Sequence, residues 1–444
     1  MKALSESRRV RYAAFAALYA VQGIPTGFIT MAIFAWLAQR GVSTGAIGTL
    51  SAIAGLPWAI KILWGPLVDR HQYLPMGRRR AWILSAQVLL LTSASCLLFI
   101  EDGPSQLTLL SWLLFLQVLC SSLQDVAIDA LAIDVFPMHE LGRANAFMTA
   151  GQIGGLAIGA AGLSQLIARF GFRSAVIAEV AAIAVLMCFP LLLRERPGER
   201  RLPWSSGGAV VAPTPTQTQS FGHLLRRVLV AVTTRSSLVY VAGILLAVTT
   251  NKLAQTIFKV HAVQELGWLD VELTQFVGVY GALVGLAGAA LAGTLADRLG
   301  HVRLLTCVVL ALAASSLAFA LVAEHWLRPA VVGVYLLFNT ALLAMAVVTI
   351  NALAMDLCTP AIAASQYAVY MAVFNIANVS GDALAGAARA LFSVPAFFVV
   401  LAGVNAVAAA LVRYVDPIAA RRALGQKGLP PDAHDVSAST VAPP

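Results

Sequence analysis

The chain has 444 residues, of which 59% are hydrophobic and 11% are charged, and its mean hydropathy is +0.81. Soluble domains are nearer to half apolar and a quarter charged, so this composition excludes an ordinary water-soluble protein and indicates a chain that lies in a lipid bilayer. The net charge of +9 does not indicate nucleic-acid binding, because the basic residues are distributed as a membrane topology requires.

Twelve apolar segments predict twelve transmembrane helices, since about 20 apolar residues span the hydrocarbon core as a helix. In chain order we expect them near 12–38, 43–66, 81–100, 107–135, 144–168, 174–193, 236–259, 271–294, 303–322, 328–352, 366–388 and 392–413. The predicted fold class is therefore an all-α membrane protein.

A polar segment separates the first six predicted helices from the last six. Residues 194–235 contain the runs ERPGERR and APTPTQTQS, which are typical of a linker. We therefore predict a six-helix bundle over 1–193, a cytoplasmic linker over 194–235, a second six-helix bundle over 236–413, and a largely disordered cytoplasmic tail over 414–444.

The Lys and Arg residues of the connections predict the orientation of the chain in the membrane. With a cytoplasmic N-terminus, 22 of the 30 Lys and Arg residues lie in inner connections and 6 lie in outer ones. This bias predicts that both termini are cytoplasmic. It also explains the positive net charge without a nucleic-acid partner.

The two halves of the chain repeat each other. Gly65, Asp69 and Arg70 recur 228 positions later as Gly293, Asp297 and Arg298. Independently, IDALAIDVFP at 128–137 matches INALAMDLCTP at 350–360 with a shift of 222. Two matches at nearly the same shift predict a duplication of a six-helix unit.

The repeated G-x-L-x-D-R segment, which basic residues follow, resembles the signature loop of the major facilitator superfamily. Three stretches further resemble the AmpG-type permeases of that superfamily: Gln22–Pro25, Lys61–Arg70 with Gly77–Arg80, and Gln124–Asp129. The resemblance implies two pseudo-symmetric six-helix bundles and a monomer that imports anhydromuropeptides across the inner membrane, driven by protons, for cell-wall recycling. The implied partners are a small-molecule substrate, protons and the lipid bilayer, with no cofactor and no metal.

Two alternatives stay open. Siderophore permeases resemble the same stretches, and Gln255 stands where AmpG-type permeases tend to carry an aspartate, so a siderophore importer is the alternative within the superfamily. A membrane-embedded enzyme or receptor is the alternative from another class. The sequence contains no Walker loop, nucleophile elbow or metal-ligand spacing, so we expect a transporter that is not an enzyme.

The apolar stretch 121–137 carries Asp125, Asp129 and Asp134, although an ionised carboxylate inside a membrane costs about 2.5–3.5 kcal/mol. Asp134 has a counterpart in the repeat, Asp356, which indicates an architectural role. By resemblance, such carboxylates join the signature loops in a charge network that latches the outward-facing state. The residues expected in this latch are Gly65, Asp69, Arg70, Arg78, Asp134, Asp297, Arg298 and Asp356.

Asp125 and Asp129 are four residues apart and share one face of a helix, whereas Asp134 is rotated by about 140° from Asp129. Two close carboxylates in a medium of low dielectric favour the binding of a proton, which a proton-coupled carrier requires. The structural alternative is that both are permanently paired, for example with Lys61. The residues expected in proton coupling or substrate binding are Asp125, Asp129, Lys61, Lys252, Gln22 and Gln124.

Three further features have a structural interpretation. We expect Glu179 to lie near the outer end of the sixth helix and to reach toward Arg173, and Asp382 to pair with Arg389. The glycine-rich segment 151–162 follows no strand, so it predicts close helix packing and not a nucleotide-binding loop.

Overall fold

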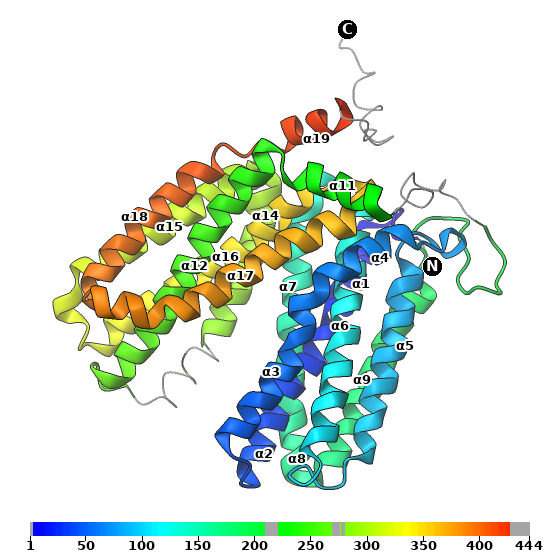
Figure 1. The fold of residues 1–444 in the computed structure, drawn as a ribbon, viewed down its shortest axis with the longest axis horizontal. Coiled ribbons are helices and arrows are strands. Elements are labelled where there is room, and N and C mark those ends of the chain that lie inside the picture. The colour runs from blue at the N-terminus through cyan, green and yellow to red at the C-terminus, as the bar shows by residue number, and fades with distance from the viewer. Residues whose placement is uncertain (1–2, 209–220, 269–275, 277–279, 427–444) are drawn as a thin grey trace. The chain divides into compact units, whose positions relative to one another are not determined.

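The computed structural model describes the whole chain except residues 1–2, 209–220, 269–275, 277–279 and 427–444 (Figure 1). The described residues form helices and no strand. Among them, twelve helical stretches are long and apolar enough to cross a membrane, which confirms the predicted all-α membrane fold with twelve spans. The stretches are Arg8–Gln39, Ala46–Arg70, Arg80–Phe99, Leu107–Val135, Met138–Phe170, Phe172–Leu192, Arg235–Gln264, Ala282–Leu299, His301–Leu321, Pro329–Leu357, Pro360–Leu391 and Val394–Val412.

The contacts within the chain divide it into two compact units. Unit 1 comprises Met1–Pro137, Phe147–Phe221 and Ile362–Ala368, and unit 2 comprises Met138–Ala146, Gly222–Ala361 and Val369–Pro444. The short segments Met138–Ala146 and Ile362–Ala368 are the starts of two helices, and each is grouped with the unit that does not contain the rest of its helix.

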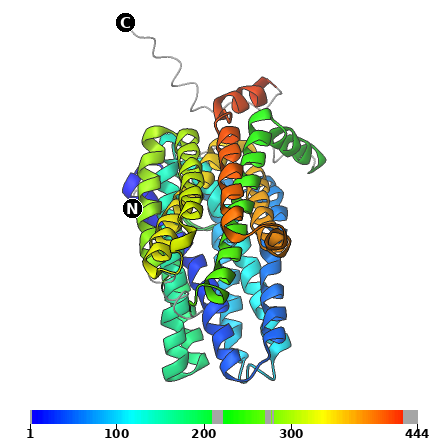
Figure 2. The ribbon, with the colours of Figure 1, turned by 90° about the vertical axis from the view of Figure 1, so that its left-hand side faces the viewer.

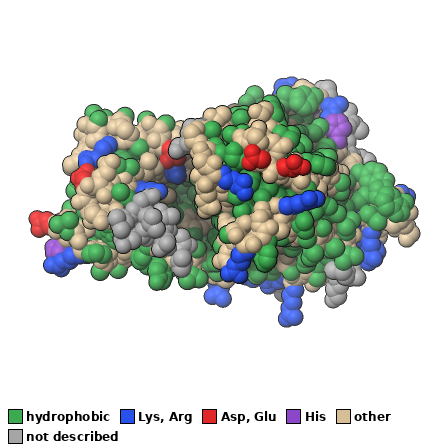
Figure 3. Space-filling view, turned by 90° about the horizontal axis from the view of Figure 1, so that it is seen from below, with side chains coloured by type: hydrophobic (Ala, Val, Ile, Leu, Met, Phe, Trp, Pro, Cys, Tyr) green, Lys and Arg blue, Asp and Glu red, His purple; other side chains and the backbone are tan. Residues whose placement is uncertain are grey.

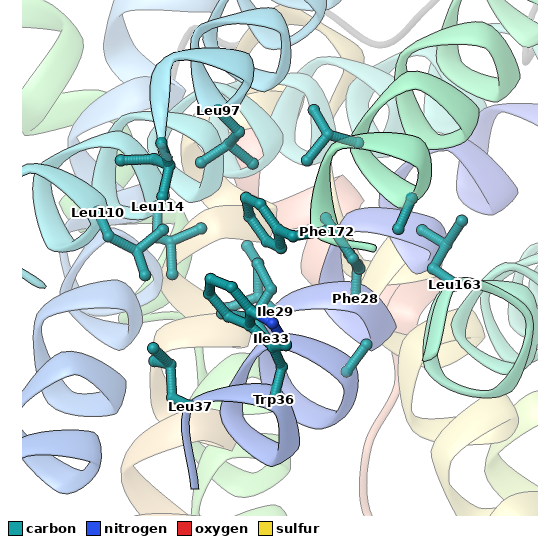
Figure 4. Packing of buried hydrophobic residues seen from close by; sticks show 14 of the residues in the cluster. Phe28, Ile29, Ile33, Trp36, Leu37, Leu97, Leu110, Leu114, Leu163 and Phe172 are labelled. Carbon is teal, nitrogen blue, oxygen red and sulfur yellow. The ribbon is translucent and has the colours of Figure 1, made fainter. Parts of the chain in front are cut away.

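Unit 1 contains the first six spans. Its elements are α1 (Arg8–Gly27), the π-helix η1 (Phe28–Ile33), α2 (Phe34–Gln39), α3 (Thr44–Ile60), η2 (Lys61–Leu63), α4 (Trp64–Arg70), η3 (Leu74–Met76), α5 (Arg80–Cys96), η4 (Leu97–Phe99), α6 (Leu107–Val135), most of α7 (Leu141–Ala157), the π-helix η6 (Ile158–Gly162), α8 (Leu163–Phe170) and α9 (Phe172–Leu192). Figure 4 shows one end of its core, where Trp36 stacks on Phe172 with ring centroids 4.3 Å apart.

Glycines let α1 and α7 approach each other within unit 1. A Cβ atom at Gly151 would lie 2.1 Å from the carbonyl oxygen of Ala16, and one at Gly155 would lie 2.4 Å from that of Ala20. At Gly159, in η6, it would lie 2.0 Å from the carbonyl oxygen of Ile24. These glycines therefore permit a close helix contact, which confirms the structural interpretation of 151–162.

Prolines shape the second span at the position that matters for the site. Pro66 has no N–H, so the carbonyl group of Ile62 loses its helical donor. At this point α3 ends at Ile60, the 3₁₀ segment η2 follows, and α4 begins at Trp64. Lys61 is the first residue of η2, so this local change of helix geometry sets the direction of its side chain.

Unit 2 contains the last six spans, and α18 lies beside α12 and α15 (Figures 1 and 2). Its elements are η5 (Met138–Glu140), the start of α7, α11 (Phe221–Val232), α12 (Arg235–Gln264), α14 (Ala282–Leu299), α15 (His301–Leu321), η8 (Ala323–His325), α16 (Pro329–Leu357), η9 (Pro360–Ile362), most of α17 (Ala363–Leu391), α18 (Val394–Val412) and α19 (Pro417–Gln426). Phe319 stacks on Tyr335 at a centroid distance of 3.8 Å inside an aromatic core.

The surface agrees with a membrane location. In the space-filling view, hydrophobic side chains make up much of the visible face (Figure 3). Large apolar side chains such as Leu63, Trp112, Val185 and Val379 are more than 60% exposed. A soluble protein rarely exposes so many, whereas lipid chains are their natural solvent.

Several helices are longer than the predicted spans, because their terminal turns are helical but contain polar residues that the hydropathy criterion excludes. Span eight was predicted to end at 294, but α14 continues through Asp297 and Arg298 to Leu299. Polar residues in a last turn lower the mean hydropathy without breaking backbone hydrogen bonds. The predicted start of this span, 271–275 and 277–279, lies outside the described residues.

The predicted linker begins with a hydrogen-bonded segment of unit 1. The N–H of Leu4 donates to the carbonyl of Arg194 at 2.8 Å, and the N–H of Arg200 donates to that of Pro75 at 2.7 Å. Buried Arg80 donates to the carbonyl oxygens of Pro190 and Arg200. In the predicted tail, Pro417–Gln426 forms α19, and 427–444 lies outside the described residues.

Candidate functional site

A buried polar cluster lies inside unit 1, where α1, η2 and α6 supply its side chains. Lys61 Nζ donates to Asp125 Oδ2 at 2.7 Å, and the two side chains are 7% and 8% exposed. The amide of Gln22 is assigned the orientation that satisfies both of its polar atoms, in which Nε2 donates to Asp125 Oδ1 at 3.0 Å. Asp125 therefore has both a cationic and a neutral partner, as a buried carboxylate requires.

Asp129 has different surroundings although it lies on the same face of α6. Its Oδ1 accepts a hydrogen bond from the Tyr19 hydroxyl, and only 2% of the residue is exposed. Among the described residues, no Lys or Arg lies within ion-pair distance of Asp129. The hydrogen-bond partner of Asp129 is therefore the neutral hydroxyl group of Tyr19, whereas Asp125 is paired with the charged Lys61.

The charges of this cluster do not balance when every group is ionised. Lys61 carries one positive charge, whereas Asp125 and Asp129 would carry two negative charges in a site that excludes water. One bound proton makes the cluster neutral, and low dielectric makes that neutrality favourable. Asp129 is the member that lacks a cation.

The sequence reasoning missed Tyr19. It lies three residues before Gln22, so the two residues share a face of α1. That spacing was a usable signal, because Gln22 was already a candidate. The other glutamine candidate, Gln124, is fully buried and donates to the carbonyl oxygen of Leu18 at 3.2 Å, beside the cluster.

Lys252 lies in unit 2, on α12. Its Nζ is 3.6 Å from Asp382 Oδ2, and Asp382 also accepts a hydrogen bond from Thr256 at 2.6 Å. Lys252 and Asp382 are 34% and 51% exposed, so this pair is accessible. The expected pair of Asp382 with Arg389 is wrong, because Arg389 donates to Glu265 at 2.6 Å instead.

A second charged network of unit 1 contains several of the predicted latch residues. Its centre is Arg79, a side chain with no exposed surface, which donates to Asp69 at 2.7 Å and to Asp134 at 2.9 Å. Arg78 is 3.8 Å from Asp134. Burial lowers the pKa of Arg79, but the attraction of Asp134 and Asp69 outweighs burial, so the net pKa is raised.

The sequence reasoning named Arg78 and not Arg79. Three consecutive arginines, Arg78–Arg80, lie at the start of α5, and only the backbone geometry there decides which of them reaches Asp69 and Asp134. Asp134 contacts this network and not the Asp129 cluster, as its predicted rotation on the helix requires. Among the described residues, no ion pair includes Arg70 or Arg298, and Arg298 is exposed.

Asp69 also binds the segment Ile362–Ala368 of its own unit. Its carboxylate accepts from the N–H of Ser365 at 2.8 Å, from the hydroxyl of Ser365 at 2.7 Å and from the N–H of Ala364 at 3.2 Å. It thus satisfies free donors at the start of α17, as a capping carboxylate does. A Cβ atom at Gly65 would lie 2.5 Å from Ser365 Cα, so this approach requires glycine.

Unit 2 repeats the arrangement with its own residues. Asp297 accepts from the N–H of Gly142 at 2.9 Å, near the start of α7, and pairs with Arg143 at 2.7 Å. A Cβ atom at Gly293 would lie 2.5 Å from that of Ala146. Each signature aspartate therefore caps the start of a helix in its own unit, so the two units share this contact as well as the sequence motif.

Asp356 differs from its counterpart Asp134 in its partners. It pairs with Arg421 of α19 and with His301, whose Nδ1 is 3.2 Å away. The sequence signal for these two partners was weak, because His301 begins a helix and Arg421 lies in the predicted tail. The two halves of the chain therefore share the carboxylate but differ in the basic residues that pair with it: Arg78 and Arg79 for Asp134, and His301 and Arg421 for Asp356.

Glu195 fixes the signature loop of unit 1, and sequence reasoning did not identify it. Its carboxylate accepts from the backbone N–H groups of Arg78, Arg79 and Arg80 at 2.7–2.9 Å. Gly77 adopts a φ of +103°, and a Cβ atom there would lie 2.4 Å from the Glu195 carboxylate. Burial raises the pKa of Glu195, and the hydrogen bonds from the loop oppose this shift.

Glu199 makes the stability of this segment dependent on pH. Burial, and next the carboxylate of Glu195, raise the pKa of Glu199 to about 7. The folded state therefore binds this proton more tightly than the unfolded state, so its contribution to stability is complete below the ordinary Glu value and is lost as the pH rises through about 7. We expect the melting temperature of the purified protein to fall between pH 6 and pH 8 by more than that of Glu199→Gln. Equal changes in both proteins would contradict this prediction.

Comparison with known proteins agrees with this architecture. Residues 15–382 match the sequence profile of the Major Facilitator Superfamily, and the chain belongs to that superfamily of membrane transporters. The anhydromuropeptide permease of Escherichia coli strain K12 is 26% identical over 82% of this chain and 71% of its own length. "Putative transporter AmpG 4" of Rickettsia conorii is 25% identical over 82% of this chain and 87% of its own length. The chain is thus a secondary transporter of this superfamily that resembles these AmpG-type relatives.

Solved structures show the same fold at low sequence identity. A bacterial homologue of the iron transporter ferroportin, in its outward-facing state, matches with a TM-score of 0.66 at 14% identity and covers 94% of this chain and 100% of its own. The proton:xylose symporter XylE matches with a TM-score of 0.65 at 15% identity and covers 92% of this chain and 97% of its own. These structures confirm the major facilitator fold and leave the substrate open.

Proposed function

We propose that this transporter imports an anhydromuropeptide across the inner membrane, with both termini cytoplasmic, and that inward proton flow drives the import. The observation that carries the coupling is the excess negative charge of the Lys61, Asp125 and Asp129 cluster. The substrate class is supported by the names of the AmpG-type relatives.

The cluster suggests separate roles for its members. Asp125 is the counterion of Lys61, and Gln22 holds it in place. Asp129 is the proton carrier, and Tyr19 is the positioning residue that orients its carboxyl group. Loss or gain of the proton changes the charge of the cluster by one unit, which biases the transporter toward one of its conformations.

The latch residues hold one of those conformations. Asp69 accepts a backbone hydrogen bond from the start of α17 in unit 1, and Asp297 accepts one from the start of α7 in unit 2. Release of such backbone contacts by small rotations fits the rigid-body rocking expected of this transporter class. Lys252 is the cation that meets an anionic group of the substrate, since its pair with Asp382 is exposed.

Uptake by cells tests this function. Cells that lack their own permease and express this protein would receive labelled N-acetylglucosaminyl-anhydromuramyl peptide, with and without a protonophore. We expect accumulation that the protonophore abolishes. No accumulation by a membrane-inserted, folded protein would exclude this substrate. Uptake of a ferric siderophore in the same cells would then support the siderophore alternative.

A further inference from the structure

A third ionisable site in unit 1 lies apart from both networks. Glu179 of α9 has no exposed surface, which shows that its predicted extension toward Arg173 is wrong. Its Oε1 instead accepts a hydrogen bond from Gln117 Nε2 of α6 at 2.5 Å. The sequence signal misled because a glutamate near a helix end can also point inward.

The other two oxygen atoms of Glu179 and Gln117 depend on the protonation state of the glutamate for their hydrogen bonds. Glu179 Oε2 and Gln117 Oε1 are both buried, and neither has a hydrogen-bond partner among the described residues. An ionised carboxylate and an amide oxygen are both acceptors, so they cannot satisfy each other. A proton on Glu179 Oε2 would turn that atom into a donor toward Gln117 Oε1. The acid and the amide would then share two antiparallel hydrogen bonds, and no polar atom of either group would stay unpaired.

The surroundings of the pair are apolar. Leu114 and Val118 flank Gln117, and Val176 and Ile183 lie one turn to either side of Glu179, all within buried hydrophobic clusters. Leu114 is visible in Figure 4 beside the packed aromatic rings. A carboxylate without a cation is unstable in such a medium, whereas a neutral acid with two hydrogen bonds is not.

No charged group on the neighbouring helices compensates Glu179. The helices packed against α9 are α1, α5 and α8, and α6 supplies Gln117. Their charged groups are Arg8, Arg9 and Arg11 in the first turn of α1, Arg80 at the start of α5, Arg169 in the last turn of α8, and Asp125, Asp129 and Asp134 farther along α6. Arg80 contacts Pro190, which is about 16 Å along α9 from Glu179. Among the described residues, no ion pair includes Glu179.

We propose that Glu179 is a proton-binding site that keeps its proton at neutral pH and, through a two-hydrogen-bond ring with Gln117, joins α6 to α9. This site is separate from Asp129, which binds and releases its proton during transport in the function proposed above. Alkaline pH removes the Glu179 proton, opens the ring and leaves a charge between two helices. The ring therefore sets an alkaline limit to the integrity of the N-terminal bundle.

Infrared spectroscopy of the purified protein with ¹³C-labelled glutamate tests the proposal without a transport assay. Labelling shifts glutamate bands away from those of aspartate, so Asp129 does not interfere. At neutral pH we expect the carbonyl band of a protonated glutamic acid in the wild type and loss of that component in Glu179→Gln. The matched control is Glu101→Gln, an exposed glutamate, which should leave the band unchanged. An unchanged glutamic-acid band in Glu179→Gln would overturn the proposal.

A second variant tests the ring itself. Gln117→Met removes the amide and keeps an unbranched side chain, so the acid band should move to the position of a carbonyl group without a hydrogen bond. A band that stays in place would exclude the ring. In thermal melts, the wild type should lose stability as the pH rises into the alkaline range, and Glu179→Gln should lose much less, because a second amide can form the same two hydrogen bonds at any pH. Equal alkaline losses in both proteins would also contradict the proposal.

Discussion

Asp129→Asn is expected to abolish uphill uptake while substrate exchange across the membrane continues. Asparagine keeps the size of the side chain and a hydrogen-bonding group for Tyr19, but it cannot carry a proton. A pH difference of one unit supplies about 1.4 kcal/mol per proton, which sustains a substrate gradient of about ten-fold whatever the charge of the substrate. A variant that cannot carry the proton should instead equilibrate the substrate to a ratio of about one.

Proteoliposomes with an imposed pH gradient provide this measurement, and the counterflow of labelled against unlabelled substrate shows that the variant is folded. The matched control is Asp102→Asn, because Asp102 is an exposed aspartate whose side chain is 55% accessible. Full accumulation by Asp129→Asn would remove Asp129 from the coupling step. Asp125→Asn should behave differently, since it leaves the buried Lys61 without its counterion and lowers the amount of folded protein.

Arg79→Ala should produce the largest loss of stability among substitutions in the signature loop. The change leaves Asp69 and Asp134 as two buried carboxylates that have lost their shared cation. Removal of one partner from a buried ion pair typically costs about 3–5 kcal/mol. Arg79→Lys should rescue little, because one ammonium group cannot reproduce the planar fork that reaches both carboxylates.

Thermal melts in detergent measure this effect. Arg78→Ala is the matched control from the preceding position, since the Arg78 side chain is 15% exposed and its guanidinium group lies 3.8 Å from Asp134. A triple variant, Arg79→Met with Asp69→Asn and Asp134→Asn, removes all three charges together and should be more stable than Arg79→Ala. If Arg79→Ala melts at the same temperature as Arg78→Ala, the network does not stabilise the protein.

The sequence predicted most of the candidate cluster and only part of the latch. Asp125, Asp129, Lys61 and Gln22 were identified because charged or polar residues are rare and costly inside apolar spans. Tyr19 was missed because tyrosine is common in membrane helices and its hydroxyl group alone gives no signal. The choice of Arg79 over its two neighbours depends on the direction of the backbone at the start of α5, which residue types do not reveal.

The sequence alone determined that the chain lies in a lipid bilayer, how many times it spans the membrane, that its two halves are a duplication, and to which superfamily it belongs. These depend on hydropathy summed over about 20 residues and on motifs such as Gly65 to Arg70, and both are local properties of the chain. The tertiary structure decided which charges meet. It paired Lys61 with Asp125 across 64 positions, joined Glu179 to Gln117, and gave Asp356 a histidine and an arginine in place of its expected partners. The physical reason is that a side chain in a low-dielectric interior must find a partner within about 3 Å, and only the packing of distant helices brings that partner into reach.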